Sequence, residues 1–183
     1  MPRFATRVLD VLCLPAQWVS WLTLPLILSI LIGVIAAKIG LNVLASWQTP
    51  IPVLGRAITV NSLQDLQWYI FALLVLFGGV MALRDERHVA VDTLVSTLSP
   101  RSRLMLRTLG DLLFLVPFCA IITWYGAKFA MVSFTTGEGS TQSGLMTRWV
   151  IKAMLPLAFG FLTLAGLTRG FGTALALIRG QRG

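Results

Sequence analysis

Four long apolar stretches limit what this 183-residue chain can fold into. They cover about residues 19–46, 66–83, 109–134 and 149–169, and each is long enough to cross the ~30 Å hydrocarbon core of a bilayer as a helix. Only 12% of the residues are charged, whereas soluble proteins carry about 25%. The sequence therefore predicts an all-α integral membrane protein with four transmembrane helices, folded as a single membrane domain over residues 1–183.

Short motifs predict where two of these helices begin. The run Ser62-Leu-Gln-Asp65 resembles a capping box ahead of the second span. Ser99 followed by Pro100 is a favourable cap and first position for the helix that leads into the third span. Within that span, Pro117 predicts a kink.

Glycines predict where helices approach each other closely. Gly78 and Gly79 lie near the inner end of the second span, and Gly166 and Gly170 form a Gly-x-x-x-Gly motif in the fourth. Because glycine has no side chain, a neighbouring helix can come nearer at such positions. The cysteines Cys13 and Cys119 form no Cys-x-x-Cys pair, and we interpret both as small packing residues.

Two shorter segments have the pattern of amphipathic helices. Residues 3–14 carry an apolar stripe with arginines mostly off it, which is typical of a helix in the membrane interface; a frayed tail is the alternative. Residues 84–98 carry a second apolar stripe, and Arg84, His88 and Asp92 follow one edge of it at a spacing of four. This second segment is therefore expected on the membrane surface or against a partner subunit.

The distribution of positive charge predicts the orientation. Cytoplasmic loops are enriched in Lys and Arg, which also explains the net charge of +8 without a nucleic-acid partner. With four spans, ten Lys and Arg residues fall on the side of the termini and five on the other: Lys38, Arg56, Lys128, Arg148 and Lys152. Both termini and residues 84–107 are therefore predicted to be cytoplasmic.

Two sets of residues are candidate contact sites. Arg84, His88, Asp92 and the aromatic Trp68 are candidates for contact with a partner subunit. The alternatives are a stabilising ladder on the helix surface for the first three and an interfacial anchor for Trp68. On the opposite face the candidates are the charged residues of the outer loops, which are otherwise simply solvated: Arg56, Glu138, Arg148 and Lys152.

Catalytic chemistry is poorly represented. No charged residue falls near the middle of a span, and the one histidine, His88, lies outside the spans, where it cannot bind a haem between helices. We therefore predict no enzyme, cofactor or metal site. The alternatives are a metal site made by His88 with nearby carboxylates, and a four-helix membrane redox or lipid-modifying enzyme subunit.

The stretch from Trp68-Tyr69 through Gly78-Gly79 to Arg84-x-x-x-His88-Val89-x-Val91-Asp92 resembles the small membrane subunit of tripartite ATP-independent periplasmic (TRAP) transporters, the DctQ family. A later stretch also resembles the branch of this family associated with organic acids: Trp124-Tyr125, Ser133, Glu138 and Trp149 to Lys152.

This resemblance implies a role without catalysis, in the bacterial inner membrane. The expected partners are a large permease subunit that holds the substrate and sodium sites, a periplasmic substrate-binding protein and membrane lipids. The small subunit would be a fixed scaffold against which the mobile part of the permease moves. The expected cargo is an organic anion such as a carboxylate, taken up by means of ion gradients.

Overall fold

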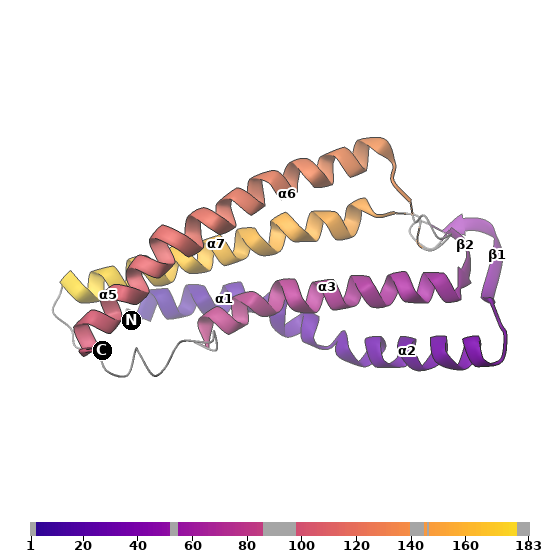
Figure 1. The fold of residues 1–183 in the computed structure, drawn as a ribbon, viewed down its shortest axis with the longest axis horizontal. Helices are drawn as coiled ribbons and strands as arrows, with labels where there is room; N and C mark the ends of the chain where they lie inside the picture. The colour runs from indigo at the N-terminus through magenta and orange to yellow at the C-terminus, as the bar shows by residue number, and fades with distance from the viewer. Residues whose placement is uncertain (1–2, 52–54, 86–97, 140–144, 146, 179–183) are drawn as a thin grey trace.

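The structure is a computed structural model that describes residues 3–51, 55–85, 98–139, 145 and 147–178. Four long helical segments lie lengthwise in a bundle (Figure 1), and their ranges are Phe4–Lys38, Val60–Arg84, Arg101–Thr136 and Trp149–Ile178. Each is long and apolar enough to cross a membrane. This confirms the prediction of an α-helical membrane protein with four spans.

The start of α1 and the end of α7 lie at the same end of the bundle (Figure 1). The elements follow one another in the order α1 Arg3–Ser20, α2 Thr23–Lys38, β1 Val43–Ile51, β2 Gly55–Thr59, α3 Val60–Arg84, α5 Pro100–Leu109, the π-helical turn η1 Gly110–Leu115, α6 Val116–Thr136 and α7 Trp149–Ile178.

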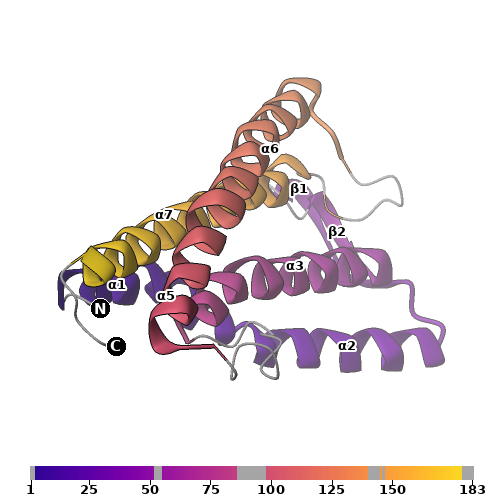
Figure 2. The same ribbon diagram turned by 60° about the vertical axis from the view of Figure 1, so that its left-hand side comes forward.

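Helix α7 is the centre of the bundle, since it packs against α1, α3, α5 and α6. Helix α2 packs on α3 instead, and Figure 2 shows α2 and α6 on opposite sides of the molecule. The main core cluster joins α1, α3 and α7 and consists of buried aliphatic and thiol side chains: Leu9, Leu12, Cys13, Val80, Leu83 and Ala165. Both cysteines are free and buried, as the packing interpretation requires.

The predicted helix over residues 3–14 is part of the longer helix α1. Its inward face is made of Ala5, Leu9, Leu12, Cys13 and Ala16, and small residues on this face let α1 approach α3 and α7. Phe4 and Val11, which belong to the predicted apolar stripe, stay exposed on the other side and remain available to lipid.

The first span ends earlier than predicted. We expected a helix to about Ser46, but α2 ends at Lys38 and Gly40 follows with a φ of 73°, a left-handed conformation that ends helices. Strands β1 and β2 then form an antiparallel hairpin, in which the indole Nε1 of Trp47 donates to the carbonyl of Gly55 at 2.7 Å. The sequence prediction missed this hairpin.

Two helix starts can be compared with their predictions. Ser99 caps α5, because its hydroxyl accepts a hydrogen bond from the amide of Ser102 at 3.2 Å, and Pro100 is the first residue of the helix. Helix α3 begins sooner than predicted: Thr59 is its cap, and its side chain and that of Ser62 each accept from the other's backbone amide. Asp65 is therefore free for another contact, described below.

The Gly-x-x-x-Gly motif is a close contact between α7 and η1. A Cβ atom at Gly170 would lie 2.7 Å from Cδ2 of Leu112, and one at Gly166 would lie 3.1 Å from Cδ2 of Leu115. The prediction for the other glycine pair was wrong within the chain, because a Cβ at Gly78 or Gly79 would have no described neighbour within 4 Å.

We predict that Gly170→Ala destabilises the protein, whereas Gly78→Ala leaves the stability unchanged or raises it. Overpacking costs about 1–3 kcal/mol, which exceeds the ~1 kcal/mol gained when alanine replaces a helical glycine. Thermal unfolding in mild detergent should therefore show a lower Tm for Gly170→Ala. Equal Tm values for the two variants would contradict the close packing of α7 on η1.

Candidate functional sites at the two ends of the bundle

Three elements meet at a buried ion pair near the end of the bundle that holds the start of α1. Asp111 in η1 accepts hydrogen bonds from two nitrogens of Arg169 in α7, and the Nε–Oδ2 distance is 2.6 Å. The Nη1 atom of Arg169 also donates to the carbonyl of Leu83 in α3, at 2.7 Å. The carboxylate and guanidinium side chains are only 6% and 15% exposed. The pair therefore holds α3, η1 and α7 together.

Local structure brings Asp111 and its neighbours toward α7. A kink was predicted at Pro117, which has no amide hydrogen to donate. The structure has the π-helical turn η1 just before it, ending at Leu115. One turn earlier, the hydroxyl of Thr108 donates to that of Thr173 at 2.8 Å, and both residues are buried. Polar contacts of η1 and α5 with α7 thus lie beside the glycine contact.

The sequence analysis did not predict the pairing of Asp111 with Arg169. It placed the two residues in the third and fourth spans, on the same predicted side of the membrane, without relating them. A usable signal was present, because a lone acid and a lone base at equal depth in neighbouring apolar helices are expected to pair.

The candidate partner-contact residues are only partly described. Arg84, at the end of α3, forms an ion pair with Asp10 of α1, with an Nη2–Oδ1 distance of 2.5 Å. These side chains are 34% and 54% exposed, so the pair adds little to stability. His88 and Asp92 lie outside the described residues.

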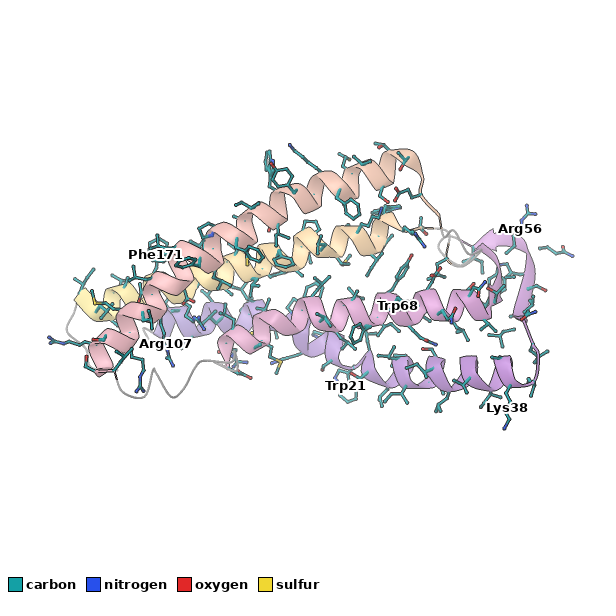
Figure 3. All side chains as sticks on the ribbon, in the orientation of Figure 1. Trp21, Lys38, Arg56, Trp68, Arg107 and Phe171 are labelled. Carbon is teal, nitrogen blue, oxygen red and sulfur yellow. The ribbon has the colours of Figure 1, made fainter. Side chains whose placement is uncertain are left out.

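Trp68 lies far from Arg84 on the same helix. The two residues are 16 positions apart in α3, or about 24 Å along the helix axis. The indole is 70% exposed and thus open to lipid or to another protein (Figure 3). The structure therefore does not bring Trp68 together with Arg84.

Three of the four candidates on the opposite face come together where α6 connects to α7. The carboxylate of Glu138 accepts hydrogen bonds from Lys152 Nζ and from the hydroxyl of Ser133, the latter at 2.8 Å. The amide of Arg148 donates to the carbonyl of Glu138 at 3.1 Å. The Nζ atom of Lys152 also lies 4.2 Å from the ring centre of Phe129, a cation–π contact. This cluster joins the end of α6 to the start of α7.

The same connection is tied to α3. The Asp65 carboxylate accepts a hydrogen bond from the amide of the buried Leu145 at 3.1 Å, which is the contact that Asp65 makes in place of capping α3. Arg56 stands apart from the Glu138 cluster, since it projects from the hairpin in β2 (Figure 3).

The chemistry of these clusters is that of ion pairing. Among the described residues, no group of three or more His, Cys, Asp or Glu side chains is placed to hold a metal ion. The hydrogen bonds from Lys152 and then Ser133 are the main causes that lower the pKa of Glu138 below its ordinary value of 4.5, so this residue is a stable anion at neutral pH.

We predict that Asp111→Asn and Arg169→Gln each destabilise the protein by about 3 kcal/mol or more, because each leaves one buried charge without its partner. The double variant Asp111→Leu/Arg169→Met removes both charges and should recover part of that loss. Thermal unfolding of the four proteins tests this. Additive losses in the double variant would contradict direct coupling of the pair.

We predict that the Glu138 carboxylate stabilises the fold only above acid pH. Because its pKa is lowered in the folded state, its contribution is present above its ordinary pKa and is lost as the pH falls through the folded value. The Tm difference between the wild type and Glu138→Gln should shrink between about pH 7 and pH 3. Lys152→Gln should reduce this pH dependence. A Tm difference that stays constant with pH would contradict the prediction.

Comparisons with known proteins agree with a membrane protein of four spans. Residues 48–175 match the family described as "Tripartite ATP-independent periplasmic transporters, DctQ component". A Haemophilus influenzae protein, whose name assigns it provisionally to the TRAP transporter small permease proteins, is 26% identical over 124 residues, which are 67% of this chain and 73% of that protein. No solved structure gave a significant match. With a family match over most of its length and four helices able to span a membrane, the chain belongs to the DctQ component family of TRAP transporters.

Proposed function

We propose that this chain is a scaffold for a large permease subunit that takes up an organic anion, such as a carboxylate, by means of an ion gradient. A periplasmic substrate-binding protein delivers the anion to the permease. The observation that carries this proposal is the family match over residues 48–175. The name of the Haemophilus influenzae relative, a small permease protein, points the same way.

The positions of the charges support a static role. The described ion pairs lie toward the two ends of the bundle, Asp10–Arg84 and Asp111–Arg169 at one end and Glu138–Lys152 at the other. A pathway for an ion or substrate would need polar groups along the middle of the spans. Fixed ends and an apolar middle suit a subunit that holds its shape while its partner moves.

We place both termini and residues 84–107 in the cytoplasm of a bacterium, on the excess of Lys and Arg at that end. The end with the hairpin, Arg56 and the Glu138 cluster then faces the periplasm. Charged groups there are available to a periplasmic binding protein.

Arg84 has a contact within its own chain, and this refines the docking hypothesis. Its pairing with Asp10 links α3 to α1. Contact with the permease is then assigned to His88 and Asp92, with Trp68 as a separate contact within the membrane.

We predict that His88→Ala and Asp92→Ala reduce recovery of the large permease with this chain by several-fold while its own expression stays normal. Asp10→Ala removes only the internal pair and is the matched control for Arg84→Ala, so these two variants should lose equal stability. Co-purification from membranes in mild detergent, together with uptake of labelled carboxylate, measures the effects. Full complex recovery for His88→Ala and Asp92→Ala would contradict the docking role, and intact uptake after deletion of the chain would contradict the scaffold itself.

A further inference from the structure

An apolar groove opens in the half of the bundle nearer the hairpin. Its volume is about 460 Å³, and its walls come from the start of α2, the first half of α3 and the first turns of α7, including Leu22, Leu66, Leu73, Ile151 and Met154. Pro25, at one edge, is exposed, so the groove opens on the outer surface of the bundle.

The groove exists because α2 separates from α7. The helix is interrupted at Trp21-Leu22, between the end of α1 at Ser20 and the start of α2 at Thr23. Before this break, α1 packs against both α3 and α7, whereas α2 beyond it packs mainly on α3. The space that α1 fills in one half of the bundle is thus left open in the other.

The chemistry of the walls selects a hydrocarbon occupant. The lining side chains are apolar apart from the hydroxyl of Tyr69, and the neighbouring outer face of α2 is aliphatic, with Leu24, Ile27 and Leu28 exposed. A small-molecule site would instead hold several well-placed polar groups.

The size of the groove favours a lipid chain over a helix of another protein. A helix is about 10 Å across and advances ~5.4 Å per turn, so this volume would take only about one turn. A membrane-spanning helix needs contact along ~30 Å. A flexible acyl chain, in contrast, can lie in a short, narrow groove.

A positively charged residue lies directly before one wall of the groove in the sequence. Arg148 immediately precedes α7, whose first turns supply Val150 and Ile151 to the wall. Tyr69, which also lines the groove, is close to both Asp65 and Arg148. The Asp65 carboxylate accepts a hydrogen bond from the amide of Leu145, whereas the Arg148 side chain carries the positive charge that can attract an anion. Phosphate oxygens match the planar array of guanidinium donors, so a lipid whose chain lies in the groove can place its phosphate beside Arg148.

We propose that this groove binds one phospholipid, with an acyl chain between α2, α3 and α7 and an anionic headgroup held by Arg148. Tails in the groove and in the bilayer are equally apolar, so selectivity comes from the headgroup charge. The inference rests on membrane insertion and not on the identity of the transported substrate.

The test uses the full chain in detergent, with palmitoyl-oleoyl phosphatidylglycerol and phosphatidylethanolamine as probes and native mass spectrometry to count bound lipids. The wild type should retain one phosphatidylglycerol in preference to phosphatidylethanolamine. Arg148→Gln should reduce that preference about fivefold, the effect expected from one basic group near an anionic headgroup. Arg56→Gln is the matched control at the same end of the molecule and should retain it (Figure 3).

Ile151→Trp fills the groove and should abolish retention of the lipid, whereas Val75→Trp, on the exposed face of α3, should not. A Tm of Ile151→Trp equal to that of the wild type shows that this variant is folded. If Ile151→Trp does not fold, Arg148→Gln still tests the proposal. Equal lipid retention in wild type, Ile151→Trp and Arg148→Gln would overturn the proposal. If Ile151→Trp no longer co-purifies with the large permease but still retains the lipid, the proposal is overturned and the groove is a binding site for protein. Failure of the scaffold role would leave the lipid results unaffected.

Discussion

The buried contact of Asp111, Arg169 and the Leu83 carbonyl determines how the helices of this protein fit together. The last carbonyls of a helix have no hydrogen-bond partner within that helix. Arg169 donates a hydrogen bond from Nη1 to the Leu83 carbonyl at the end of α3, and its Nε and Nη2 atoms donate to the two carboxylate oxygens of Asp111. A shift of α7 by one residue would break all three hydrogen bonds. The next residue, Gly170, leaves room for Leu112 beside Asp111, so polar pairing and close packing impose the same register.

The far end of the bundle is held by weaker and more exposed contacts. Glu138 joins α6 to α7 through Lys152 and Ser133, and Asp65 ties the connection between these helices to α3. The Glu138 side chain is 42% exposed, against 6% for Asp111. Because solvent screens exposed pairs, the stability of this end depends less on its charges than the stability of the opposite end does.

Much of the fold could be predicted because apolar length and glycine spacing are local signals. The four spans, the start of α5 at Ser99-Pro100 and the contact at Gly166 and Gly170 follow from them. The hairpin escaped prediction because Val43, Leu44 and Ala45 at its start continue the apolar run of the span, while Pro50 and Pro52 after them indicate a loop. The Asp111–Arg169 pair joins residues 58 positions apart. Only tertiary packing could show that Glu138 contacts Lys152, while Arg56 lies apart from this cluster.

The interruption at Trp21-Leu22 gives the two halves of the bundle different roles. In one half α1 completes a core with α3 and α7, next to the buried ion pair. In the other half α2 turns away, and the start of α7 is held by α6 and by the connection at Glu138 instead. The proposed lipid chain would lie in the open half, away from the contacts that set the helix register. The break in the first span therefore separates the half of the bundle that sets the helix register from the half that leaves an apolar groove open.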